Sequence, residues 1–188
     1  MRILVIALLL GFYLGLVFPV PAHAEERQYL PTRYGVALLT GGAYDPDNIG
    51  MVIVQGQMLT DYKRFLSHRA PDKLRMKIEA NLGLTTDGRQ RSMFSLNMLA
   101  LNYFENWQIG TCTPYVEAGI GAIYTDFQVK DQGSRINFNP QLGVGFEYPL
   151  QTGGAMTLGL RLHHISNGNL LKANRGVNSA LLMFGYLF

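Results

Sequence analysis

A histidine and a serine two residues apart, His164 and Ser166, are the side chains whose types and spacing in this sequence could do chemistry. Alternate side chains of an extended strand share a face, so these two would stand side by side. An imidazole that accepts the proton of a serine hydroxyl makes that serine a nucleophile for acyl transfer. A His-x-Ser pair alone is a weak signal, and its surroundings decide what it means.

The surroundings place this pair on an apolar strand face. Leu158, Leu160 and Leu162 precede the histidine on alternate positions, and a polar loop at residues 167–176 follows the serine. A second alternating run then begins at Asn178 and ends at Phe188. Polar side chains on the apolar face are unfavourable in a soluble β-sandwich. They suit a face that contacts lipid and acts on it.

The rest of the chain shows the same period of two, broken by clusters of Gly, Asp, Asn and Pro, which is typical of β-strands and turns. Several runs have about ten to twelve residues, the length that a tilted strand needs to cross a bilayer. We therefore expect eight strands, at residues 34–42, 50–60, 74–85, 92–103, 113–125, 137–148, 155–166 and 177–188.

Charged residues in these runs fall opposite the apolar face. A soluble barrel would turn its polar face outward, whereas a continuous apolar face opposite paired charges predicts a membrane barrel whose charges point inward. The fold class expected is all-β, an eight-stranded antiparallel transmembrane β-barrel. Its interior has room for side chains only, so a conducting pore is not expected. The predicted interior network comprises Arg75, Lys77, Glu79, Glu117, Glu147, Arg161 and His163.

Composition agrees with one exported domain. The chain has 188 residues, a single cysteine, Cys112, and a net charge of +3 that is too small and too scattered to indicate a nucleic-acid partner. Residues 1–24 read as a secretory signal peptide, with an apolar core, two prolines and an Ala-x-Ala site. The mature barrel is then expected at residues 25–188.

The C-terminal strand and the strand parity indicate where the barrel sits. Aromatic residues at positions 184, 186 and 188 resemble the assembly signal of bacterial outer-membrane barrels, and they would also form an interfacial girdle. If both termini are periplasmic, the loop at residues 167–176 lies on the outer side. His164, Ser166 and Asn178 would then meet in the outer leaflet, which is lipopolysaccharide in a Gram-negative bacterium.

The segments 163–168 (His-His-Ile-Ser-Asn-Gly) and 174–178 (Asn-Arg-Gly-Val-Asn), followed by an aromatic last strand, resemble the lipid A deacylase (PagL) family of outer-membrane barrels. The specific match covers about the last thirty residues. The resemblance implies a serine esterase that hydrolyses the 3-O-linked acyl chain of lipid A. The implied partners are lipid A and outer-membrane lipid, with no cofactor.

Carried over residue by residue, the resemblance makes Ser166 the nucleophile and His164 the base. It assigns the oxyanion donors to the Asn174 side chain and to a backbone N–H near Gly168 or Asn169. Asn167 belongs to the same pattern, and both a turn-shaping role and a direct role in oxyanion or substrate binding stay open for it. The family's third catalytic member is a glutamate, and here that position is Asn178. An amide oxygen can still accept a hydrogen bond from the imidazole, although it stabilises an imidazolium less than a carboxylate does. Reduced activity, another acyl ester as substrate and loss of catalysis are all open outcomes.

Other readings stay open at this stage. A non-enzymatic barrel of the OmpA-like or OmpW-like kind would have the same strands and would act through its loops. A homodimer is compatible with the sequence. The basic segment at residues 61–73 reads as a solvated turn or as an interfacial segment. No carboxylate cluster stands at ligand spacing near His163 and His164, so we expect no metal site.

Overall fold

The computed structural model describes residues 29–46, 49–66 and 70–188. The expected signal peptide at residues 1–24 lies outside them. The described chain forms strands joined by turns, with two single-turn 3₁₀ helices, η1 (Tyr62–Arg64) and η2 (Glu105–Trp107). No helix in these ranges is long and apolar enough to span a membrane. The strands are β1 (Arg33–Asp45), β2 (Gly50–Asp61), β3 (Arg75–Thr85), β4 (Ser92–Tyr103), β5 (Thr113–Thr125), β6 (Ile136–Phe138), β7 (Gln141–Pro149), β8 (Ala155–Ile165) and β9 (Val177–Leu187).

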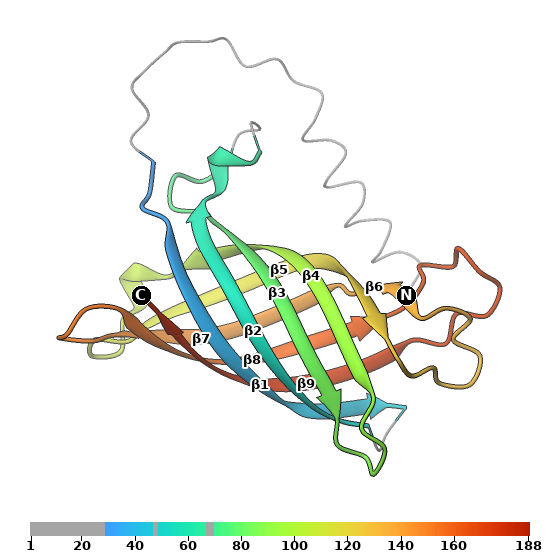
Figure 1. Cartoon of the computed structure of the whole chain (residues 1–188). Helices are drawn as coiled ribbons and strands as arrows, with labels where there is room; N and C mark the ends of the chain where they lie inside the picture. Colours follow the sequence, from blue (N-terminus) through green and yellow to red (C-terminus); the bar gives the residue numbers. More distant parts are fainter. Residues whose placement is uncertain (1–28, 47–48, 67–69) are drawn as a thin grey trace, which may run out of the picture.

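The strands close into an antiparallel barrel. Each strand from β1 to β5 pairs with the next along the chain, β7 pairs with β8, β8 with β9, and β9 returns to pair with β1. Figure 1 shows the tilted strands, with the C-terminus at one end of the barrel and the loop between β8 and β9 at the other. We call the end that carries this loop the distal end. The predicted eight-stranded antiparallel barrel is confirmed.

One strand differs in detail from its prediction. The sequence pattern predicts a continuous sixth strand over residues 137–148. The structure has two shorter strands there, β6 and β7, which both pair with β5 and together occupy the place of one barrel strand. The break falls at Asn139 and Pro140, and proline has no backbone N–H to donate to a ladder. The interruption lies beside the distal end of β8, where His164 N–H donates to Pro140 O at 3.1 Å.

The two faces of the wall have the predicted character. Exposed and buried residues alternate along β8, with the leucines at 158, 160 and 162 outward and Arg161 and His163 buried inside. Apolar side chains outside and polar ones inside are the arrangement of a barrel that contacts lipid. Alternation therefore decides which of the two adjacent histidines can meet a lipid.

The predicted interior network is present. Arg161 contacts Glu79 at 2.8 Å and also pairs with Glu117, while Lys77 lies 2.9 Å from Glu117 and 3.2 Å from Glu79. All four side chains are almost fully buried. Two cations and two anions thus balance one another, as burial of charge requires. Glu147 is half-buried and pairs with Arg33 instead.

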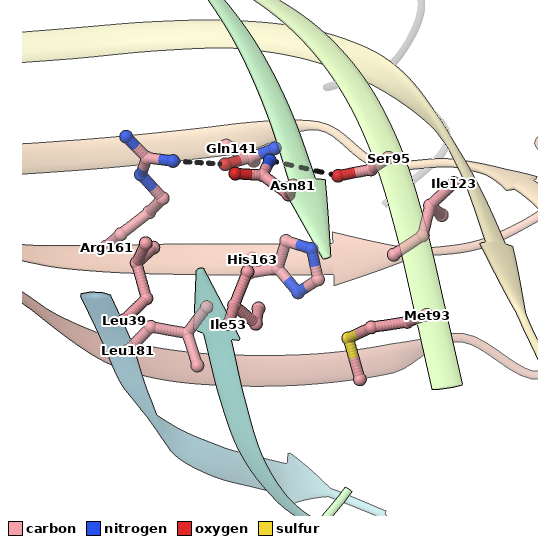
Figure 2. A pocket seen from close by; sticks show the side chains of 10 residues that line it. All are labelled: Leu39, Ile53, Asn81, Met93, Ser95, Ile123, Gln141, Arg161, His163 and Leu181. Atoms are coloured by element: carbon pink, nitrogen blue, oxygen red, sulfur yellow. Dashed lines mark hydrogen bonds between the residues drawn. The ribbon is translucent and has the colours of Figure 1, made fainter. Parts of the chain in front are cut away.

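A small interior cavity remains beside this network (Figure 2), and His163 points into it. Arg161 donates to Gln141 at 2.9 Å, and Asn81 donates to Ser95 at 3.0 Å. The cavity lies across the barrel wall from His164, which does not line it. It is enclosed by Leu39, Ile53, Asn81, Met93, Ser95, Ile123, Gln141, Arg161, His163 and Leu181.

The basic segment at residues 61–73 joins β2 to β3. Its described part contains η1, where the Asp61 side chain accepts the Lys63 N–H, and an ion pair of 2.5 Å between Lys63 and Asp72. Tyr62 is buried, whereas Phe65 is exposed. The described part of the segment is held by local polar contacts, at the end of the barrel away from His164.

Candidate active site

His164 and Asn178 are cross-strand partners at the distal end, His164 near the end of β8 and Asn178 near the start of β9. Partners in an antiparallel pair point to the same face and stand close together. His164 Nδ1 lies 2.6 Å from Asn178 Oδ1. Both side chains are half-buried on the outer face of the wall. They therefore lie on the face that strand alternation predicts for them.

Ser166 stands on the same outer face, one residue beyond the end of β8. Its backbone is held by a reciprocal bridge to Phe138 of β6: Phe138 N–H donates to Ser166 O at 2.8 Å, and Ser166 N–H donates to Phe138 O at 3.0 Å. This bridge extends the β8 geometry past its last residue. Ser166 therefore keeps the alternation that puts it beside His164.

The Ser166 hydroxyl makes no hydrogen bond with any described residue. The positions of Ser166 and His164 on one strand face permit a hydrogen bond between them, but the described residues show none. Alternate residues on a strand lie about 6.6–6.8 Å apart along it. Two such side chains can therefore be neighbours without touching. Such bonds are often long without substrate and shorten when substrate binds.

Gly176 closes one side of the imidazole. A Cβ atom added at Gly176 would lie 2.6 Å from His164 Cε1 and 3.3 Å from His164 Nε2. Real Cβ atoms do not approach carbon so closely, so a side chain here would displace the ring. The absence of a side chain at this position lets the imidazole keep its place, with Nε2 free of hydrogen bonds to the described residues.

Asp45 also reaches this site, although sequence reasoning did not single it out. It is the last residue of β1, and its Oδ2 accepts a hydrogen bond of 3.2 Å from Asn178 Nδ2. The same carboxylate pairs with Arg175. Strand parity could have found it, since parity places the loop after the first strand at the distal end.

Asn174 has a constrained amide. Its Oδ1 accepts the Asn167 backbone N–H at 2.8 Å, and its Nδ2 donates to Asn169 Oδ1 at 2.9 Å. An amide nitrogen carries two hydrogens, so one donor of Asn174 is left over. The side chain thus keeps one N–H that no described residue accepts, which is the group that an oxyanion donor needs.

Asn167 has a structural role. It is buried, and its Nδ2 donates to Gln132 O at 3.1 Å and to Ala173 O at 2.7 Å. The first of these bonds reaches the loop between β5 and β6. Asn167 thereby ties two distal loops together.

Gly168 and Asn169 follow in left-handed conformations, with φ of 65° and 67°. Two consecutive left-handed residues point their backbone N–H groups in directions that differ from those in a regular strand. Asparagine tolerates the left-handed conformation better than most residues. Neither backbone N–H donates to another described residue. Both are available to an incoming oxygen, which is the property that a backbone oxyanion donor needs.

The described residues contain no group of three or more His, Cys, Asp or Glu side chains that could hold a metal ion. The chemistry-bearing groups that the site does contain come from His164, Ser166, Asn174 and the backbone at Gly168 and Asn169. They offer a hydroxyl, an imidazole held through Nδ1, and several N–H donors.

Sequence comparison finds a family. The family model described as "Lipid A 3-O-deacylase (PagL)" matches residues 72–187. Two curated relatives are each named lipid A deacylase PagL. The one from Pseudomonas aeruginosa is 35% identical over 74 residues, 38% of this chain and 40% of that protein. The one from Bordetella bronchiseptica is 38% identical over 77 residues, 39% of this chain and 41% of that protein. The chain thus spans about two fifths of the length of these relatives.

Structural comparison finds the same kind of barrel in proteins of different roles. The outer-membrane enzyme PagL matches with a TM-score of 0.58 and 21% identity, over 80% of this chain and 97% of that one. Neisserial surface protein A matches with the same TM-score and 13% identity, over 83% and 94%. At these identities the likeness concerns the fold, so function must be argued from the site.

Proposed function

This chain belongs to the lipid A 3-O-deacylase (PagL) family of outer-membrane β-barrels, and from that premise we propose that it is an esterase that removes the 3-O-linked acyl chain of lipid A. The substrate is membrane-embedded, so the reacting groups must face lipid. His164, Ser166 and Asn178 lie on the lipid-facing side of the wall. Leu162 and Leu142 are exposed on the same face and would contact the acyl chain.

The reaction follows from the roles of these atoms. His164 Nε2 takes the proton of Ser166 as its Oγ attacks the ester carbonyl, and the imidazolium donates through Nδ1 to Asn178 Oδ1. The oxyanion accepts hydrogen bonds from Asn174 Nδ2 and from a backbone N–H at Gly168 or Asn169. The proton then passes to the departing 3-hydroxyl of lipid A. Water, activated by the same imidazole, releases the fatty acid from Ser166.

One observation carries this proposal: the bond of 2.6 Å between His164 Nδ1 and Asn178 Oδ1 on the outer face. An imidazole held through Nδ1 keeps an Nε2 lone pair for a proton. A polar pair that merely anchored the barrel at the headgroups would not need an oriented acceptor behind the imidazole. The ordered acceptor therefore favours catalysis over anchoring.

Lipid A from Gram-negative cells that make the protein tests the proposal. Mass spectrometry should show loss of one 3-O-linked acyl chain when the wild type is made, and no loss with Ser166→Ala. Ser179→Ala is a matched control, because Ser179 lies on the inner face of β9 near the same end and is fully buried. That variant should deacylate like the wild type. Unchanged lipid A with the wild type would favour a non-enzymatic barrel. Deacylation by Ser166→Ala would show that Ser166 is not the nucleophile.

A further inference from the structure

A glutamate in place of Asn178 would hold the imidazole without ambiguity, because both carboxylate oxygens only accept. An asparagine has an acceptor on one side of its amide and donors on the other. If the amide turned its NH₂ group toward His164, Nδ1 would have to accept. The proton would then sit on Nε2, which could no longer take one from Ser166. The site therefore needs a group that fixes the orientation of the Asn178 amide, with its oxygen toward His164.

Asp45 meets this requirement. Its Oδ2 faces Asn178 Nδ2 at 3.2 Å, and an ionised carboxylate can only accept hydrogen bonds. The NH₂ side of the amide must therefore point to Asp45, which leaves Oδ1 pointing to His164. The constraint passes on to the imidazole, whose Nδ1 must donate and whose Nε2 must accept.

The backbone of β1 is shaped to bring Asp45 there. Ala43 pairs with Ser179, and in regular register Tyr44 would come opposite Asn178. The register shifts between Ala43 and Asp45, so Asp45 takes that place instead. β-Bulges re-aim side chains in this way and are common beside functional sites.

The charge of Asp45 is compensated on its far side. Arg175, in the loop before β9, pairs with Asp45 Oδ1, while Oδ2 faces Asn178. An ion pair reduces the cost of holding a carboxylate near lipid. The family resemblance implies a carboxylate at position 178, and here the carboxylate lies on the neighbouring strand, with the Asn178 amide between it and the imidazole.

We infer that Asp45 is a positioning residue for the proposed esterase, acting through Asn178 to keep His164 in the tautomer that can accept the serine proton. This inference rests on the proposed function. It predicts that a carboxylate is needed at position 45 or at position 178, and that the two positions can exchange roles.

Four proteins, the wild-type barrel and three variants assayed on purified lipid A in detergent micelles, test the exchange. Asp45→Asn should lower kcat about tenfold or more with KM within about twofold, because the amide of Asn178 is no longer fixed. Asn178→Glu in that background should restore kcat to at least the wild-type value, since the introduced carboxylate can accept hydrogen bonds from the imidazole and from the new amide at position 45.

Arg175→Gln breaks the ion pair but keeps Asp45 beside Asn178, and it should retain kcat within about threefold. Wild-type kcat in Asp45→Asn, or no recovery in the double variant, would overturn the inference.

The ¹⁵N chemical shifts of the His164 imidazole give a readout that does not depend on activity. The wild type should show the tautomer protonated at Nδ1, and Asp45→Asn should show a mixture of both tautomers. The same tautomer in both proteins would overturn the role of Asp45. A tautomer change in a protein that releases no acyl chain would support Asp45 as the positioning residue and would refute the proposed esterase.

Discussion

His163 and His164 are adjacent in the sequence but lie on opposite sides of the barrel wall. His163 is buried against the interior cavity, whereas His164 is half-buried on the outer face and bonds Asn178. Two chemically identical side chains on neighbouring residues therefore face different environments, one the barrel interior and the other the lipid. This relationship supplies an internal control for any test of the imidazole.

Replacement of each histidine by glutamine should separate the two environments. We expect His164→Gln to lower kcat for acyl release by about 10²–10⁴-fold, the range for loss of a general base. His163→Gln should keep wild-type activity, because its side chain cannot reach the outer leaflet. Acyl release from lipid A by both purified variants is the measurement. Equal losses in the two variants would show that the assignment of His164 is wrong.

The approach of Gly176 to the imidazole predicts a steric effect. In Gly176→Ala the new Cβ would meet His164 Cε1 at 2.6 Å and push the ring from its place. We expect kcat to fall about tenfold, equivalent to ~1.4 kcal/mol, with the barrel folded. Gly56→Ala is the control, because the nearest atom to a Cβ there is Ala80 O at 4.0 Å. If Gly176→Ala has the kcat of Gly56→Ala, the imidazole does not need this space.

The interior network predicts an unequal effect of single and paired substitutions. Arg161→Met leaves Glu79 and Glu117 facing Lys77 alone, and an uncompensated buried charge costs about 3–5 kcal/mol. Addition of Glu79→Gln restores one cation to one anion, so the double variant should be the more stable of the two. Samples are heated at a series of temperatures before SDS gel electrophoresis, and the temperature at which the folded band disappears reports this order. A double variant less stable than Arg161→Met would contradict the charge-balance account.

The outer face predicts a contrast between two exposed leucines. Leu160 lies at the middle of β8, and Leu170 lies in the loop after it, with 52% and 76% of their surfaces exposed. Leu160→Arg should destabilise the barrel by about 2–4 kcal/mol, because its charge would enter the hydrocarbon layer. Leu170→Arg should have no such cost, since loop side chains reach water. Unfolding in urea from lipid vesicles measures both, and equal stabilities would argue against a membrane-spanning position for β8.

Local spacing was enough to predict much of this protein from its sequence. A period of two determines which side chains share a face, so the outward leucines, the inward charges and the separation of His163 from His164 all follow from alternation. The pairing of His164 with Asn178 is also local, because β8 and β9 form one hairpin whose register depends on few residues.

Only the closed tertiary structure decided the rest. Asp45 and Asn178 are separated by 133 positions, and they meet because β1 pairs with β9 and carries a bulge at that level. The contact of Asn167 with Gln132 and the bridge of Ser166 to Phe138 likewise join segments that no short spacing connects. The register at the barrel's closure is a property of all the strands together. For that reason the sequence could identify the histidine and its amide acceptor, whereas the carboxylate behind them emerged only from the fold.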